Sequence, residues 1–129
     1  MSTVYLILGS NIGDRISNIQ TAVKFLADTP DIEVLDSTTF YETEPYGNKT
    51  DNWFVNAGLK LEVDLKPNEL LAILQNIESK MGRNRLTETP WGDRIIDIDI
   101  IFYDNEILET ENLTIPTNSP TKGHLYSYP

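Results

Sequence analysis

The chain has 129 residues, which is enough for one domain with a hydrophobic core and too few for two ordinary domains. Its formal net charge of -10 argues against broad binding to nucleic acid or to anionic membrane surfaces, and the absence of cysteine excludes disulfides, thiolate metal sites and cysteine nucleophiles. The first residues do not resemble a signal peptide and no apolar run approaches the roughly 20 residues that span a bilayer, so we expect a cytoplasmic protein without membrane segments.

The first part of the chain predicts a strand, a helix and a second strand. Residues 4–10 are β-rich and end in a Gly-Ser-Asn turn at 9–11, which predicts a first, central strand. Asp14 is a candidate N-cap for a helix that ends at Ala27, because apolar residues recur after it at helical spacing. Residues 32–47 predict one long second strand that breaks up at its proline and glycine.

The second part predicts a strand, a helix and a strand. Residues 52–64 predict a third strand that forms a hairpin with the second. Pro67 opens an amphipathic helix that stops at Gly82, and residues 94–104 predict a fourth strand after a polar loop. The order β-α-β-β-α-β predicts a single α+β domain over residues 1–129, a ferredoxin-like sandwich with an antiparallel sheet and both helices on one face.

The stretch WGDRIIDIDI, residues 91–100, places two carboxylates on a buried strand. Because strand side chains alternate, Asp97 and Asp99 share one face and the isoleucines share the other. Adjacent carboxylates repel one another, and Mg²⁺ is commonly bound by one or two carboxylates together with phosphate oxygens and water. The alternative is an ordinary solvent-exposed strand face, and the strand alone does not choose between them.

Positive charge gathers immediately before this carboxylate pair. Four of the ten Lys and Arg residues lie between residues 80 and 94, among them Arg83, Arg85 and Arg94. Arginine together with a metal ion is typical of sites that neutralise a polyphosphate, whereas the alternative is a solvated loop beside an acidic body. Trp91 in the same stretch is either a core residue or a cover over a ligand.

A mixture of polar and aromatic residues surrounds the predicted hairpin. An aromatic slot with one amide suits a flat heterocycle, but a hairpin core with a hydrogen-bonded Asn is the alternative. The residues concerned are Thr43, Pro45, Tyr46, Phe54 and Asn56. The turn at 9–11 resembles a phosphate cradle, yet it lacks the spacing of known phosphate-binding motifs and is interpreted as a structural helix entry.

Six motifs lie in the order and near the spacing of one enzyme family over about residues 3–116. They are LGSNIGDR (8–15), FYETEPYG (40–47), NWFVNA (52–57), ESKMGRNR (78–85), WGDRIIDIDIIFYDN (91–105) and LTIP (113–116). Together they resemble 6-hydroxymethyl-7,8-dihydropterin pyrophosphokinase, and the WGxRxxDxDI pattern is the most specific of them. The resemblance implies the same ferredoxin-like core that the element order predicts.

The resemblance implies transfer of a diphosphate group from ATP to the pterin, with AMP leaving, in tetrahydrofolate biosynthesis. It implies that Asp97 and Asp99 bind two Mg²⁺ ions that bridge the ATP phosphates, and that ATP and dihydropterin are the partners of a monomer. The implied catalytic residues are Arg83, Arg85, Arg94, Asp97 and Asp99. The implied pterin-binding residues are Thr43, Pro45, Tyr46, Phe54, Asn56 and Trp91. The implied ATP-binding residues are Gln75, Glu78, Arg85, Ile100 and Thr114.

Residues 117–129 do not continue the family's pattern and are interpreted as an aberrant tail. Read one base out of phase from the Pro116 codon, this segment can encode I-P-H, five residues and then R-A-F-V-F-V-P-L, as the family would require. We therefore predict that a single-nucleotide deletion shifted the reading frame, with loss of C-terminal ATP and pterin contacts and reduced or lost activity. The alternative is a naturally divergent tail, and sequencing the gene distinguishes the two.

A second class of function remains open from the sequence. The chain could be a non-catalytic ferredoxin-like module that binds nucleotide or metal, or an interaction domain. AMP production separates the enzyme from the module.

Overall fold

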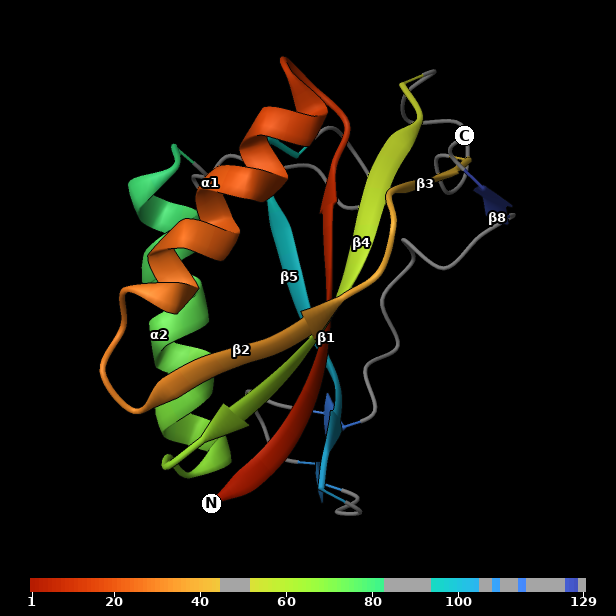
Figure 1. The fold of residues 1–129 in the computed structure, drawn as a ribbon. Coiled ribbons are helices and arrows are strands. Elements are labelled where there is room, and N and C mark those ends of the chain that lie inside the picture. Colours follow the sequence, from red (N-terminus) through yellow and green to blue (C-terminus); the bar gives the residue numbers. More distant parts are fainter. Residues whose placement is uncertain (45–51, 83–93, 105–107, 110–113, 116–124, 128–129) are drawn as a thin grey trace.

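The computed structural model describes residues 1–44, 52–82, 94–104, 108–109, 114–115 and 125–127. Two helices cover one face of a six-stranded sheet in this part of the chain (Figure 1). In chain order the elements are β1 (Ser2–Ser10), α1 (Arg15–Ala27), β2 (Ile32–Ser37), β3 (Tyr41–Thr43), β4 (Phe54–Val63), α2 (Pro67–Lys80), β5 (Asp97–Tyr103), β6 (Leu108–Glu109), β7 (Thr114–Ile115) and β8 (Leu125–Ser127).

The sheet is antiparallel and has β1 near its centre. Its strand order is β5-β1-β4-β3-β8, with β2 paired to β4 beside β3, and each of these pairings is antiparallel. This arrangement confirms the predicted ferredoxin-like order and the central position of the first strand. Strands β6 and β7 form a separate antiparallel pair.

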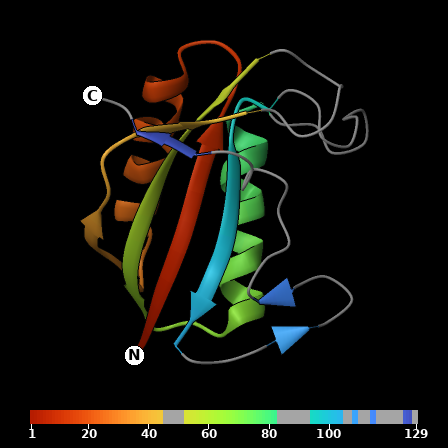
Figure 2. The ribbon, with the colours of Figure 1, turned by 90° about the vertical axis from the view of Figure 1, so that its right-hand side faces the viewer.

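Both helices pack on the same face of the sheet, behind the strands in the view of Figure 2. Their buried residues join one hydrophobic core with alternate residues of β1, β4 and β5. The helical contributions are Ile19, Ala22 and Leu26 from α1 and Leu70, Leu74 and Ile77 from α2. Because strand side chains alternate, the remaining residues of β1, β4 and β5 lie on the opposite face, here called the open face. Neither helix is long and apolar enough to cross a membrane.

The helix ends follow from local sequence as predicted. Asp14 caps α1, and its carboxylate accepts a hydrogen bond from the Ser17 backbone N–H at 3.1 Å. Pro67 occupies the first turn of α2, where its missing N–H costs no helical bond. Gly82 has a φ of +96° just after α2, a backbone conformation that favours glycine and ends the helix.

The prediction of a single second strand over residues 32–47 is wrong, because the described part of that region, residues 32–44, contains two strands, β2 and β3. Thr38 lies between β2 and β3, where its backbone N–H donates to the Gly58 carbonyl at 2.9 Å. Its hydroxyl accepts from the Gly58 N–H at 2.8 Å. The register against β4 shifts between β2 and β3, from Ser37 opposite Leu59 to Tyr41 opposite Asn56. The Thr38 side chain thus replaces a backbone group as the acceptor of one hydrogen bond between strands, at the point where the strand is interrupted. The alternation of apolar and polar residues along the chain does not predict such an interruption.

Candidate active site

Four residues from distant parts of the chain lie in one row across the open face. Asp97 of β5 is opposite Gly9 of β1, Gly9 is opposite Asn56 of β4, and Asn56 is opposite Tyr41 of β3. Residues adjacent to this row in sequence, including Leu8, Val55 and Ile98, point into the core. The carboxylate and the amide singled out in the sequence therefore share one face of the sheet.

The two aspartates lie two residues apart on β5, which separates them by roughly 7 Å along the strand. Asp99 is opposite Ile7, both aspartates are half-buried, and Ile98 and Ile100 between and after them are buried. The predicted division of this strand into an isoleucine face and an aspartate face is confirmed. The described residues contain no cluster of three or more His, Cys, Asp or Glu side chains that could hold a metal ion. A pair of carboxylates nevertheless fits Mg²⁺, which completes its shell with phosphate oxygens and water.

Asn56 is a completely buried amide on this face, with 0% exposure. Its Nδ2 donates to the Thr43 hydroxyl at 2.8 Å, which orients the amide. Its Oδ1 is buried without a hydrogen-bond partner in the described structure. An unsatisfied buried acceptor costs about 1–3 kcal/mol, so a ligand that donates a hydrogen bond here would recover that free energy. This observation favours the binding interpretation of the hairpin over the fully hydrogen-bonded alternative.

Gly9 makes room for the buried amide. A Cβ atom at this position would lie 2.7 Å from Asn56 Oδ1 and 3.2 Å from Phe54 Cδ1. Phe54 is itself 5% exposed, two residues before Asn56 on β4. The turn pattern at residues 9–11 does not predict this role of Gly9, although a glycine within a β-rich run is a known signal of close backbone approach.

We expect Gly9→Ala to lower the free energy of unfolding by roughly 1–3 kcal/mol, because the added methyl overlaps the Asn56 amide. Urea unfolding measures the change. The double variant Gly9→Ala with Asn56→Ala removes the overlapping oxygen, so its loss should be smaller than the sum of the two single losses. Additive losses would contradict this role for Gly9.

Tyr41 lies at the end of the same row, and burial raises the pKa of its phenol above 10.0. The folded chain therefore keeps this proton at pH values where the unfolded chain has lost it. The contribution of this pKa shift to stability is fully present below pH 10 and is lost as the pH rises through the pKa of Tyr41 in the folded chain. We expect Tyr41→Phe to remove this alkaline contribution and to remove one phenol that ionises above pH 10 from the phenolate absorbance titration. A titration unchanged by the substitution would contradict this assignment.

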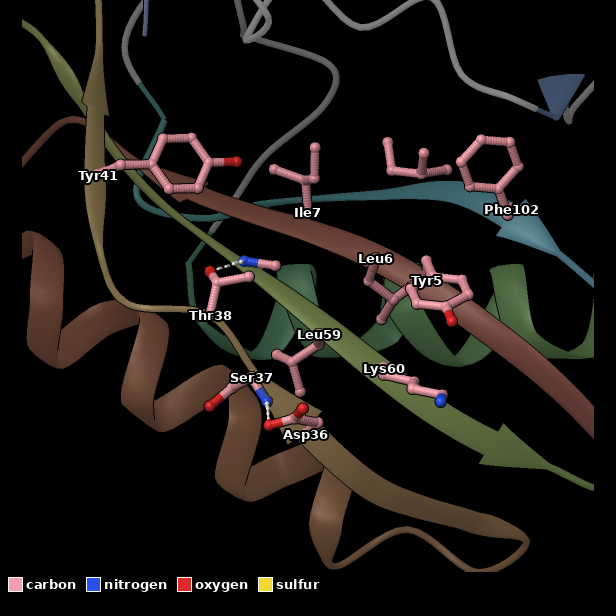
Figure 3. A pocket seen from close by; sticks show the side chains of 12 residues that line it. Tyr5, Leu6, Ile7, Asp36, Ser37, Thr38, Tyr41, Leu59, Lys60 and Phe102 are labelled. Atoms are coloured by element: carbon pink, nitrogen blue, oxygen red, sulfur yellow. Dashed lines mark hydrogen bonds between the residues drawn. The ribbon is translucent and has the colours of Figure 1, made fainter. Parts of the chain in front are cut away.

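The open face is hollowed next to the row. A groove of about 550 Å³ is lined by residues that include Ile7, Tyr41, Lys60 and Phe102. Ile7 and Tyr41 stand above the sheet in Figure 3, with the Thr38 bond to Gly58 beneath them. A second, more polar cavity of about 360 Å³ lies at the end of β1, lined by Asn11, Ile12, Gly13, Arg15, Asn52 and Trp53.

Arg15 connects this polar cavity to the hairpin and was not singled out from the sequence. Its Nη1 donates to the Trp53 carbonyl at 2.9 Å, and its Nη2 lies 3.3 Å from the Glu42 carboxylate. Both charged side chains are about one-third exposed, so the pair orients the groups more than it stabilises them. The guanidinium holds the start of α1 against β3 and the entry to β4.

The predicted nucleotide residues of α2 lie on the helix side of β5. Glu78 is 2% exposed, and its Oε2 accepts from the Ile98 backbone N–H at 2.9 Å. Gln75 is exposed on α2, and the Ile100 side chain is buried in the core. The structure therefore does not bring these three side chains onto the face that carries Asp97 and Asp99.

The other predicted site residues lie before β5, in β7 or outside the described residues. Arg94 is described, and its backbone pairs with Asn11. Thr114 lies in β7, of which only the backbone is described. The remaining predicted residues, Pro45, Tyr46, Arg83, Arg85 and Trp91, lie outside the described residues.

The strand order and the row of polar side chains define an α+β ferredoxin-like domain with a carboxylate pair and a buried amide on its open face. A sequence model of the family 7,8-dihydro-6-hydroxymethylpterin-pyrophosphokinase (HPPK) matches residues 5–127. The chain belongs to this family.

Relatives from several bacteria agree with that assignment. A 2-amino-4-hydroxy-6-hydroxymethyldihydropteridine pyrophosphokinase from Methylorubrum extorquens is 40% identical over 116 residues, which is 90% of this chain and 72% of the relative. The enzyme of that name from Haemophilus influenzae is 39% identical over 90% of this chain and 71% of its own length. The one from Aquifex aeolicus is 40% identical over 100% of this chain and 78% of its own length.

A solved structure shares the fold. The crystal structure of an HPPK-DHPS in complex with substrates aligns with a TM-score of 0.62 at 16% identity, over 83% of this chain and 28% of that one. The family match and the Aquifex alignment both extend into residues 117–129, where the family pattern was not apparent from the sequence. The reading-frame hypothesis stays a prediction for the gene sequence to test.

Proposed function

We propose that this chain transfers diphosphate from ATP to 6-hydroxymethyl-7,8-dihydropterin, giving the pterin diphosphate and AMP in folate biosynthesis. The observation that carries the proposal is the buried, unpaired Oδ1 of Asn56 in the same sheet row as Asp97. A pterin ring is a flat heterocycle edged with N–H donors, so it supplies the donor that this oxygen lacks. Membership of the pyrophosphokinase family supports the same reaction.

The pterin side of the proposed site is built on β3 and β4. Thr43 orients the Asn56 amide. The absence of a side chain at Gly9 leaves room for the amide and the Phe54 ring to lie against the sheet. Donation from the ring to Asn56 Oδ1 would then fix the ring plane and direct its hydroxymethyl group along the sheet row. Pro45, Tyr46 and Trp91 complete the wall of this pocket in the proposal.

The nucleotide side is built on β5. Asp97 and Asp99 would hold two Mg²⁺ ions, which neutralise phosphate oxygens when bound. Arg83, Arg85 and Arg94 would contact the phosphates, with Thr114 as a further nucleotide contact. The side chains of Gln75, Glu78 and Ile100 lie on the helix side of β5 and take no part in the proposed phosphate site.

The reaction needs positioning more than strong acid or base chemistry. The hydroxymethyl oxygen attacks the β-phosphorus in line and its hydroxyl proton is released to solvent, while the bond from that phosphorus to the α-phosphate bridging oxygen breaks and AMP leaves with those electrons. The row from Asp97 to Asn56 spans three adjacent strands, which lie about 4.8 Å apart from one to the next. A rigid sheet is thus able to hold the attacking group and the phosphates at a constant separation.

Incubation with ATP, Mg²⁺ and the dihydropterin tests the proposal. We expect AMP and pterin diphosphate in equal amounts, and no AMP when the dihydropterin is left out. Calorimetry with each ligand accompanies the assay. Binding of ATP or pterin without AMP formation would contradict the proposal and favour the non-catalytic module.

A further inference from the structure

Asn11 lies immediately after β1, the strand that carries Gly9, and is 3% exposed. Its backbone N–H donates to the Arg94 carbonyl at 3.0 Å, and its Oδ1 accepts from the Arg94 N–H at 2.5 Å. Its Nδ2 donates to the Asn52 carbonyl at 3.2 Å. One buried amide therefore joins the backbones that lead into β5 and β4, on the two sides of β1.

These bonds continue the sheet beyond the end of its regular pairing. Pairing of β1 stops at Gly9 opposite Asp97 on one side and at Ser10 opposite Val55 on the other. Beyond that point both polar atoms of the Asn11 side chain are used, one toward each neighbouring strand. The row Asp97, Gly9 and Asn56 is thus followed by a second row, Arg94, Asn11 and Asn52, that a side chain holds together.

A different residue holds the turn itself. Asn18 Nδ2 donates to the Ser10 hydroxyl at 3.1 Å and to the Ile12 carbonyl at 3.0 Å. The local shape of the turn after β1 therefore does not require the Asn11 side chain. The hydrogen bonds from the Asn11 side chain to Arg94 and Asn52 therefore serve a purpose other than shaping the turn.

We infer that Asn11 is a positioning residue for the transfer reaction, an inference that rests on the proposed function. Its side chain fixes the Arg94 backbone, three residues before Asp97, relative to the Asn52 backbone, four residues before Asn56. It thereby sets the separation between the phosphate-binding and pterin-binding sides of the site. Misplacement of reacting groups by about 1 Å costs on the order of 100-fold in rate, so this separation matters to the reaction.

Three variants separate positioning from simple stability. Asn11→Ala removes both side-chain bonds. Asn11→Asp keeps an acceptor for the Arg94 N–H but sets an oxygen against the Asn52 carbonyl. Asn18→Ala is the matched control, because it removes two bonds at the end of β1 and its turn and none to the segments that lead into β4 and β5. Kinetics are measured well below the unfolding temperature of each variant, together with hydrogen exchange of the Arg94 amide.

We expect Asn11→Ala to lower kcat/KM by about 10- to 100-fold and to speed exchange at Arg94. Asn11→Asp should keep Arg94 protected and raise KM for the dihydropterin more than KM for ATP. Asn18→Ala should leave kcat and both KM values near those of the wild type.

Two results would overturn the inference. One is Asn11→Ala with wild-type kcat and KM values, and the other is an equal loss of kcat/KM in Asn18→Ala. Either result leaves the proposed function intact, because in both cases the wild-type chain still forms AMP. No AMP from the wild-type chain would instead contradict the proposed function, and the inference with it.

Discussion

Replacing Asp97 or Asp99 with Asn is expected to lower kcat for AMP formation by about 1,000-fold. The amide keeps the size of the side chain but loses the charge that would attract Mg²⁺ to the phosphates. Metal neutralisation of phosphate oxygens supplies several kcal/mol of transition-state stabilisation, and each 1.4 kcal/mol is about tenfold in rate. Both side chains lie on the open face while Ile98 and Ile100 face the core, so the substitutions should leave the fold intact.

The matched control is Glu62→Gln on the same open face. Glu62 is a half-buried acidic residue near the far end of β4, opposite Thr3 of β1. We expect this variant to retain wild-type kcat. Calorimetric titration of Mg²⁺ with a non-hydrolysable ATP analogue should show weaker metal binding in both aspartate variants. Unchanged metal binding and unchanged kcat in them would refute the assigned metal role.

The double variant Thr43→Val with Asn56→Leu is expected to fold at least as stably as the wild type and to bind the dihydropterin about 10- to 100-fold more weakly. Replacing both partners of a buried hydrogen bond by apolar groups of similar shape is nearly neutral for stability. The substitution also removes the unpaired Oδ1, whose burial costs about 1–3 kcal/mol. Loss of that acceptor leaves a ring donor unpaired in the complex, which weakens binding by about 1–3 kcal/mol.

A double variant with unchanged or higher stability and weaker binding of the dihydropterin would identify Asn56 as a residue that serves ligand binding and not folding. Thr43→Val alone is the control for the orienting bond, because it preserves the Thr43 backbone and the Asn56 acceptor. Denaturant unfolding and calorimetry with the dihydropterin measure the two quantities. A double variant that loses stability while binding the pterin normally would show that Asn56 is purely structural.

The fold could be predicted from the sequence because each element carries a local signal. The apolar spacing from Ile16 to Leu26 and the cap at Asp14 predicted α1, and both were confirmed. The alternation around Asp97 and Asp99 predicted which face of β5 is buried. Such features depend on residues a few positions apart, and periodicity detects them.

Features that depend on tertiary contacts could not be predicted in the same way. The division of the second strand arises from the Thr38 side chain bonding Gly58, twenty residues along the chain. The use of Gly9 as space for Asn56 and the reach of Asn11 to Arg94 involve even longer separations. The sequence named the carboxylate pair and the buried amide but gave no register between strands, so it could not show that they share a row.

Glu78 has a consequence for the solubility of this protein. Among the described strands β5 ends the strand order, and the outermost strand of a sheet offers unpaired N–H groups to which another polypeptide can add as a further strand. The Glu78 carboxylate from α2 takes the Ile98 N–H on that strand. The helix that completes the hydrophobic core therefore also obstructs strand addition at this boundary, and reduces the tendency of one copy to aggregate with another through β5.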